Sequence, residues 1–439
     1  MALRTIRRVL SLLLLILMFP CLFARSQTPE DKISKQDLSW LKDVLTTTRD
    51  DIKKNYYDPH YHGLDIDSRF QLALEKLQSA STRNYAVADI AGAVSALNDS
   101  HTIFLPPPRP YVHENGWRMQ AEGDSDCFIT AVHPDSDAAR KGLKVGDQLL
   151  SVAGYTAIRE DIWKIRYVFG SLRPQPGLRL ILRSPTGVTR QLDVMADLHP
   201  RTRNPWKQRD EFEAQQRNHK PRFFEYGQKA IIFRLPDFSF DPEEAHKMLD
   251  GIRTHDALVL DLRGNPGGYV EFLLRFLGGM FDHDVKMADR IGRKPMHVSV
   301  AKSRGSKTFS GKLVVLVDSE SASAAELFAR VVQLEKRGIV IGDRSSGKVM
   351  ESRVYPHQEE TMKGVFQFAV LITDADLIMA DGKSLENTGV VPDERVIPVA
   401  SDLAAGRDPA LARAAELVGI NLSPEEAGKL FPFEWPTEY

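Results

Sequence analysis

The chain has 439 residues, which leaves room for roughly three domains at about 150 residues each. Hydrophobic residues make up 42% of it and charged residues 27%, as in ordinary globular proteins. The formal net charge of −1 provides no basic surplus for a polyanion, which argues against a nucleic-acid partner.

The first residues have the pattern of a targeting segment. Three arginines precede the apolar run VLSLLLLILMFPCLF, and Ala24-Arg25-Ser26 follows it. A basic start, a short apolar core and a small-x-small end predict a secretory signal peptide over residues 1–26. We therefore expect an exported protein, periplasmic or extracellular, that meets a membrane only through this segment or transiently at its surface. An uncleaved membrane anchor is the alternative, although the run is short for a span.

Cysteine and histidine usage predicts no metal site or other cofactor. Of the two cysteines, Cys21 falls in the signal and leaves Cys127 alone, so no intramolecular disulfide is expected. His60 and His62 in DPHYHG have no acidic or cysteine partner at ligand spacing. A surface loop is the favoured interpretation of that segment.

Residues 27–110 are expected to form a helical region. Apolar residues recur at helical spacing in two places, at Phe70, Leu74 and Leu77 and at Ile90, Val94 and Leu97. The prolines of LPPPRP cannot continue a helix, so we expect helix and domain to end there together.

Residues 111–197 are expected to be rich in β-structure. The short runs CFITAV, QLLSVAG and LRLILRS are separated by turn residues, with one helical piece at SDAARKG. The stretch VHPDSDAARKGLKVGDQLLSVAG resembles a PDZ domain, with a mild departure at Asp137, where that family usually has proline. PDZ domains bind a peptide tail as an added strand. The resemblance places a peptide-binding loop at Gly116, Trp117, Arg118 and Met119.

Residues 198–439 alternate strand and helix after a polar stretch near 201–220, which predicts an α/β layout with a buried sheet. Three of its strands end in unusual segments: RGNPGG, SESASAAE and DRSSGK. Reactive groups in such folds gather at the carboxyl ends of strands.

The segment GDRSSGKV, residues 342–349, matches the start of a phosphate-binding loop. That loop needs Ser or Thr where Val349 stands, and a helix directly afterwards. Here VMESRVYPHQ alternates like a strand and soon meets Pro356. No nucleotide site is therefore expected.

Each of the three strand ends has two interpretations on its own residues. Lys348 is either a surface lysine or a base whose burial keeps it neutral, as in Ser–Lys variants of the catalytic triad. Ser323 either caps a helix with Glu326, three residues on, or is a nucleophile at the positive end of that helix. The glycines of RGNPGG either make a tight turn or expose amides to a ligand.

Taken in order, these segments resemble the C-terminal processing peptidases (tail-specific proteases), the Ser–Lys endopeptidases of the S41 type. That family carries LxDxHTxF, a PDZ domain, DLRxNPGG, SASxxE and GxxxxGK. The matching residues here are 97–102, 261–268, 321–326 and 342–348, and DGKSLENTGVVPD at 381–393 matches another family segment. The resemblance implies a multidomain α+β and α/β protein with a helical N-terminal region, a PDZ-like domain, and a ClpP/crotonase-like catalytic core with a C-terminal helical tail.

The resemblance also implies roles for individual residues. Ser323 would be the nucleophile, Lys348 the base and Glu326 an assisting carboxylate. The backbone amides of Gly268 and Ala324, together with Gly267, would form the oxyanion hole. Many family members orient the lysine with a glutamine four residues later, where this chain has Ser352. His101 is interpreted as structural, because the lysine already fills the role of base.

The sequence therefore predicts an exported serine endopeptidase that cleaves proteins at or near their C-termini, with a PDZ domain that recognises or gates the tail. A non-catalytic PDZ peptide-binding protein on a protease scaffold is the alternative. Intact Ser323 and Lys348 favour the enzyme, whereas Ser352 favours the alternative.

Overall fold

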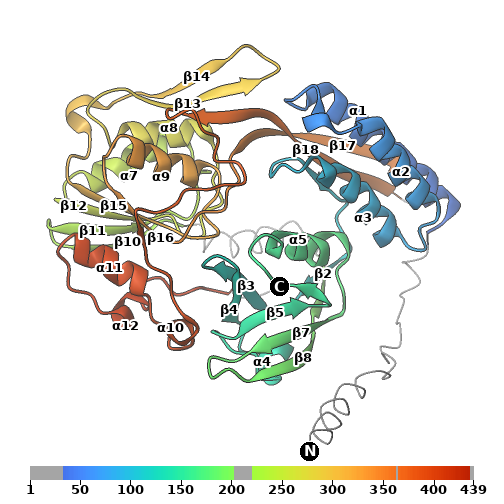
Figure 1. Ribbon diagram of the computed structural model, residues 1–439, viewed down its shortest axis with the longest axis horizontal. Coiled ribbons are helices and arrows are strands. Elements are labelled where there is room, and N and C mark those ends of the chain that lie inside the picture. Colours follow the sequence, from blue (N-terminus) through green and yellow to red (C-terminus); the bar gives the residue numbers. More distant parts are fainter. Residues whose placement is uncertain (1–32, 202–219, 362–363, 436–439) are drawn as a thin grey trace, which may run out of the picture.

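The computed structural model describes residues 33–201, 220–361 and 364–435, whose elements form three groups (Figure 1). The predicted signal peptide at 1–26 lies outside the described residues, as does most of the polar stretch at 201–220. Among the described helices, none combines the length and apolar character needed to cross a membrane.

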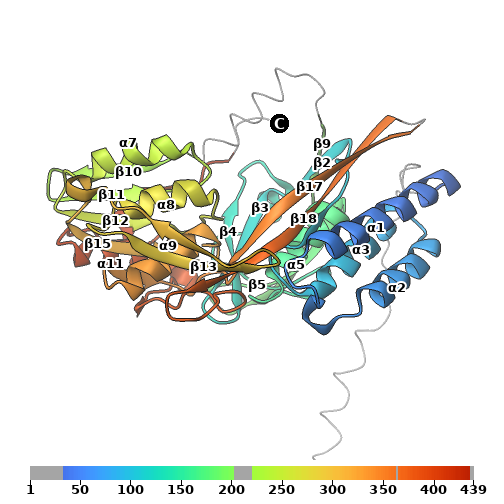
Figure 2. The ribbon, with the colours of Figure 1, turned by 90° about the horizontal axis from the view of Figure 1, so that it is seen from above.

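Three helices form the N-terminal group: α1 (Lys35–Asn55), α2 (Ile66–Gln78) and α3 (Arg83–Val94). Side chains of Ser34, Asp65 and Thr82 cap their N-termini. The core of this group is completed by Phe368 and Val370 of strand β18, and Figure 2 shows α1 and α3 lying along the β17–β18 hairpin.

Between the last helical turn and the prolines, the chain forms a strand that the sequence did not predict. Strand β1 (Ile103–Leu105) first pairs antiparallel with β18 (Gly364–Met379), with Ile103 opposite Leu371. The helical region is thereby joined to the C-terminal half through one sheet. That sheet has the order β1-β18-β13-β14, with β17 also paired to β18, and its remaining strands are β13 (Val285–Gly292), β14 (His297–Ala301) and β17 (Met350–Thr361).

The second group, residues 111–200, is called the β-rich region below. Its main sheet has the order β3-β4-β5-β7-β8, with β6 paired to β5, while β2 and β9 pair separately. The three predicted strands and the short helix are confirmed as β4, β5, β7 and α4, whereas α5 was not predicted. The elements are β2 (Tyr111–Glu114), β3 (Trp117–Glu122), β4 (Asp126–Val132), α4 (Asp137–Arg140), β5 (Gln148–Val152), β6 (Tyr155–Thr156), α5 (Ile162–Tyr167), the π-turn η4 (Val168–Leu172), β7 (Gly177–Arg183), β8 (Thr189–Met195) and β9 (Asp197–Pro200).

The third group, the α/β core, is built on a second six-stranded sheet of order β10-β11-β12-β15-β16-β19. The strands from β11 to β19 run parallel, and β10 joins β11 antiparallel. The strands are β10 (Arg222–Tyr226), β11 (Ala230–Arg234), β12 (Ala257–Asp261), β15 (Lys312–Val317), β16 (Ile339–Gly342) and β19 (Glu394–Arg395).

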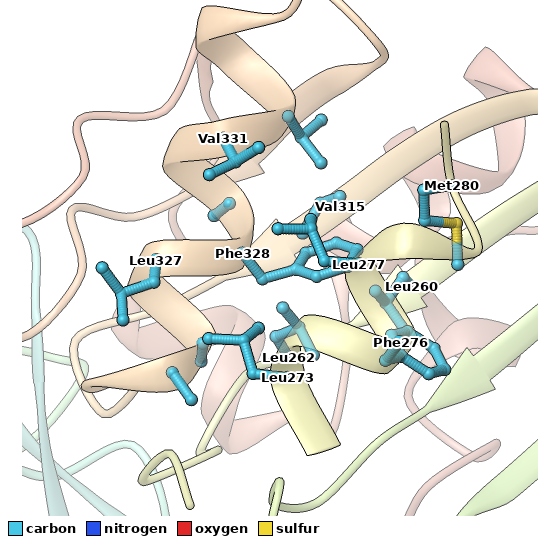
Figure 3. Close-up of a cluster of buried hydrophobic side chains, with 14 of the residues drawn as sticks. Leu260, Leu262, Leu273, Phe276, Leu277, Met280, Val315, Leu327, Phe328 and Val331 are labelled. Atoms are coloured by element: carbon cyan, nitrogen blue, oxygen red, sulfur yellow. The ribbon is translucent and has the colours of Figure 1, made fainter. Parts of the chain in front are cut away.

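Helices cover both faces of this sheet. One face packs against α7 (Pro242–Ile252), α8 (Val270–Gly278) and α9 (Ala324–Leu334), where Phe276 and Phe328 meet (Figure 3). The other face packs against α11 (Pro409–Leu417) and α12 (Pro424–Ala427), which follow the short helix α10 (Ala400–Ala404). Because both faces are buried, the central strands are continuously apolar, as predicted for an α/β core.

Candidate active site

The three unusual segments follow three adjacent parallel strands, β12, β15 and β16, so they meet at one edge of the sheet. Buried Asn265 links two of them, because its carbonyl accepts the Ala322 amide at 2.8 Å. Ser321 links all three: its Oγ donates to the Leu262 carbonyl at 2.8 Å, and its own carbonyl accepts the Ser346 amide at 2.9 Å. The loops are therefore held as one unit.

Ser323 lies directly before the first residue of α9 in a strained conformation, with φ 53° and ψ −117°. Positive φ is costly for a residue with a Cβ, of the order of 1–3 kcal/mol, and persists only where surrounding contacts impose it. Here the contacts are the Ser323 amide bonds to the Lys348 carbonyl at 2.9 Å and to Glu326 Oε2 at 3.0 Å. The half-buried serine is thus presented at a helix N-terminus.

Lys348 is half-buried beside this serine, and burial lowers the pKa of its amine. Its Nζ lies 5.8 Å from the ring centroid of Trp163, a residue of α5. Within the described part of the chain, no hydrogen bond joins Lys348 Nζ to Ser323 Oγ. The two residues are thus paired through their backbones while the amine faces the β-rich region.

Glu326 is fully buried and ties the two segments together. Its Oε2 accepts the amides of Ser323 and Lys348 at 3.0 and 2.9 Å. Its Oε1 accepts the Gly347 amide at 2.7 Å and the Ser345 hydroxyl at 2.5 Å. Burial raises the pKa of Glu326 to about 7, while these four hydrogen bonds oppose the rise. Glu326 therefore contacts Lys348 through its backbone amide.

The predicted oxyanion-hole donors separate into two kinds. No acceptor among the described residues binds the Gly268 or Ala324 amide. The Gly267 amide, by contrast, donates to Asn265 Oδ1 at 2.8 Å. The prediction for Gly267 is therefore wrong, because its amide hydrogen is already engaged.

Gly267 instead has a steric role. Its φ is +100°, and a Cβ there would lie 2.6 Å from the Cβ of Ser323. The neighbouring Gly268, at φ +149°, would place a Cβ 2.3 Å from the backbone carbon of Phe238. Only glycine allows this close approach of the loop to the nucleophile segment and to the chain after β11.

A second carboxylate, that of the half-buried Glu386, was missed as a site residue although its segment was recognised. Its Oε2 accepts the Val349 amide at 2.9 Å, and its Oε1 accepts the Ser100 amide at 2.8 Å. Both chain neighbours of Lys348 are therefore fixed by carboxylates, Gly347 by Glu326 and Val349 by Glu386. Ser352 lies in β17 opposite Thr373.

His101 is half-buried near Lys348. Desolvation lowers the pKa of its imidazole to about 4, and the positive charge of Lys348 lowers it further. Its Nδ1 lies 2.7 Å from Ser100 Oγ. The imidazole is consequently neutral at neutral pH.

The β-rich region contacts both the nucleophile and the base segments. Arg159 forms an ion pair with Asp343 at 2.7 Å, with only 7% and 2% of the two side chains exposed. Arg166 pairs with Glu320 at 2.7 Å, and Gln120 donates to Asp318 at 2.8 Å. None of these contacts was predicted, since they join residues far apart in sequence.

A cavity of about 320 Å³ lies between β3 and α5. Three residues of the predicted peptide-binding loop, Trp117, Arg118 and Met119, line it together with Ile165 and other residues from α5 to β7. The fourth, Gly116, is buried and does not line the cavity, and a Cβ there would come within 2.3 Å of the Cβ of Ser136. We call this cavity the β3–α5 groove.

Two further motifs from the sequence are the phosphate-loop-like segment at Lys348 and the histidine pair of DPHYHG. Strand β17 follows Lys348, as the alternation in VMESRVYPHQ predicted, where a phosphate-binding loop requires a helix. His60 and His62 lie in an exposed turn, and His62 Nε2 bonds the Tyr57 hydroxyl at 2.7 Å. Across the described ranges, no three His, Cys, Asp or Glu residues gather as metal ligands.

Comparison with known proteins gives related sequences over most of the chain. The tail-specific protease of Haemophilus influenzae is 25% identical over 352 residues, covering 75% of this chain and 48% of that protein. The carboxy-terminal processing protease CtpB of Bacillus subtilis is 25% identical over 282 residues, covering 61% of this chain and 55% of that protein. The chain thus spans about half the length of these curated relatives.

The fold also matches a solved structure. The crystal structure of mature CPAF superimposes with a TM-score of 0.63 at 16% identity, covering 84% of this chain and 94% of that one. Residues 229–396 match the family model described as Peptidase family S41. These residues contain all three loops of the candidate site. Residues 229–396 therefore form a peptidase family S41 domain.

Proposed function

We propose that the chain is a serine endopeptidase in which Ser323 is the nucleophile and Lys348 is the base. The observation that carries this proposal is the direct pairing of the two segments, through the Ser323 amide and the Lys348 carbonyl at 2.9 Å. The lowered pKa of Lys348 supports the base role, because only the neutral amine accepts a proton.

In the proposed first step, neutral Lys348 accepts the hydroxyl proton of Ser323 while Oγ bonds to a peptide carbonyl carbon. The oxyanion that forms is stabilised by the amides of Gly268 and Ala324. The peptide C–N bond then breaks, and the Lys348 ammonium returns the proton to the leaving amine. Water cleaves the resulting ester by the same route and restores free Ser323.

The amine of Lys348 must turn from Trp163 toward Ser323 for this step. The lysine side chain is flexible and its backbone is held by Glu326 and by Ser323 itself, so the proposed movement is a change of side-chain rotamer. Because Trp163 belongs to α5, the position of the β-rich region influences where the amine rests. This is consistent with a gating role for that region.

We further propose that the β-rich region is a PDZ-type module whose β3–α5 groove binds a peptide tail. A groove between a strand and a helix is the geometry in which an added strand is bound. The names of the relatives support protein C-termini as the substrate class. Export, expected from residues 1–26, would place the enzyme among periplasmic or extracellular substrates.

The test combines an active-site probe with two variants. A fluorophosphonate should label the wild type, which should also degrade unstructured casein, whereas Ser323→Ala should do neither. Lys348→Ala should lower the labelling rate by about a hundredfold or more, with an unchanged melting temperature. Ser310→Ala and Lys307→Ala, which change exposed residues away from the site, are matched controls.

Two outcomes contradict the proposal. A folded wild type that neither labels nor cleaves casein supports the peptide-binding scaffold without catalysis. A Lys348→Ala variant that labels at the normal rate removes Lys348 from the mechanism.

A further inference from the structure

The last described residues form an arm that starts on the α/β core. Phe431 packs edge-on against Phe224 of β10, with ring centroids 5.3 Å apart. The guanidinium groups of Arg222 and Arg234 lie 5.5 and 5.7 Å from the centre of the same ring. Arg222 also pairs with Glu434 at 3.4 Å. Residues 431–435, called the C-terminal arm below, are therefore rooted on β10 and β11.

The other end of the arm lies on the β-rich region. The Phe433 ring lies 4.7 Å from the Arg118 guanidinium, within cation–π distance. Trp435 contacts His133 edge-on at 5.2 Å and Phe433 at 5.0 Å. His133 in turn donates its amide to the Gly116 carbonyl at 2.8 Å. The arm thus bridges the core and the edge of the β3–α5 groove.

Arg118 belongs to both the groove and the arm contacts, since it lines the groove and its guanidinium stacks on Phe433 of the arm. Arg166 lines the same groove from α5. Desolvation and the nearby positive charge of Arg166 lower the pKa of Arg118, while Glu320, which pairs with Arg166 at 2.7 Å, partly offsets them. A peptide carboxylate in the groove would stabilise the Arg118 charge further through a charge-assisted hydrogen bond.

We propose that the C-terminal arm competes with a carboxylate-bearing peptide for Arg118 and so restrains binding in the β3–α5 groove. A carboxylate entering the groove draws the Arg118 guanidinium away from the Phe433 ring, because a charge-assisted hydrogen bond is stronger than stacking on one aromatic face. Loss of that contact loosens the tip of the arm while its root at Phe431 stays in place. The inference rests on the proposed peptide-binding role of the groove, but it does not depend on catalysis.

The experiment measures peptide affinity in the Ser323→Ala background, where cleavage plays no part. The probe is fluorescein-labelled Gly-Ser-Gly-Ser-Ala-Val with a free terminal carboxylate, compared with the same peptide amidated. Replacing both Phe433 and Trp435 by Ala should lower the Kd of the carboxylate peptide about three- to tenfold and leave the amide unchanged. Phe433→Leu keeps apolar contact without a π face, so it should give a smaller gain.

Two further variants complete the design. Phe223→Ala removes an aromatic side chain of β10 that is 58% exposed and makes no aromatic ring contact with the described residues, so the Kd should not change. Arg118→Ala should abolish both the preference for the carboxylate and the effect of the arm. Unchanged or weaker binding in the arm variants, or equal binding of the two peptides to the unaltered groove, would overturn the proposal. Because the assay needs no turnover, a failure of the Ser323–Lys348 mechanism would be seen separately.

Discussion

Ser323 and Lys348 owe their positions to backbone contacts. The nucleophile is held at positive φ by two bonds to its amide, and the base segment supplies one of the acceptors. The side chains themselves remain without a mutual bond, so the geometry fixes the two Cα positions and leaves the amine free to turn. The reactive pair is thus preorganised at its backbone and adjustable at one side chain.

The lowered pKa of Lys348 predicts the pH dependence of acylation. The neutral amine is the active form, so the rate of fluorophosphonate inactivation should rise with pH and level off below 10.5, the ordinary value for lysine. The inactivation rate at each pH, from neutral to alkaline, is measured by quenching the labelling reaction at a series of times. Lys348→Arg, which stays protonated throughout, should show no rise. A wild-type rate that is independent of pH over this range would exclude lysine as the base.

At the level of elements, Glu326 connects the start of α9 with the loop after β16. The sequence indicated a capping box, and the Glu326 side chain does reach back to the Ser323 amide. The tertiary structure adds Ser345, Gly347 and Lys348 as donors to the same carboxylate. One side chain thereby sets the spacing between the nucleophile and base segments.

Glu326→Gln should weaken this connection, since a glutamine amide group would face two of the four donors. We expect the free energy of unfolding to fall by about 1–3 kcal/mol, the cost of leaving buried donors unsatisfied. The turnover rate should fall as well, because the backbone of Lys348 loses its anchor. Urea denaturation and casein cleavage measure the two effects. Glu335→Gln, at the exposed C-terminal end of α9, is the control, and equal stability of the two variants would refute the connection.

At the level of the whole molecule, the β-rich region docks on the two reactive loops through ion pairs of different burial. The Arg159–Asp343 pair is almost fully buried, whereas Arg166 and Glu320 are 36% and 25% exposed. Arg159 also donates to the Gly123 carbonyl at 2.6 Å and to the Arg344 carbonyl. The buried pair is therefore the principal attachment.

Arg159→Met should destabilise the protein far more than Arg166→Met. Removing Arg159 leaves the buried Asp343 charge with its longer ion pair to Arg395 at 3.5 Å, at a cost of up to about 3–5 kcal/mol, while loss of the half-exposed pair costs at most about 1 kcal/mol. Thermal denaturation followed by tryptophan fluorescence compares the two variants. Adding Asp343→Asn to Arg159→Met should recover part of the loss. Similar melting temperatures for both single variants would show that the burial of an ion pair does not determine how strongly it holds the β-rich region to the reactive loops.

The sequence by itself determined the α/β core, the β-rich region with its strands, and the order of the three reactive loops. Apolar periodicity and turn residues are local signals, and parallel strands place their carboxyl ends at one edge. These properties place the three loops at one edge of the sheet, while the roles predicted for Ser323, Lys348 and Gly268 came from the family resemblance. The motif also predicted Gly267 as an oxyanion-hole donor, but its amide already donates to the side chain of Asn265, two residues earlier.

Only the tertiary structure decided which groups surround the reactive pair. Trp163, Arg159 and Glu386 come from segments far from Ser323 in sequence, and their contacts depend on how the three groups of elements dock. The pairing of β1 with β18, which joins the helical region to the core, is likewise a long-range contact. Such contacts follow from shape and charge complementarity between folded surfaces, which no local pattern of residues encodes.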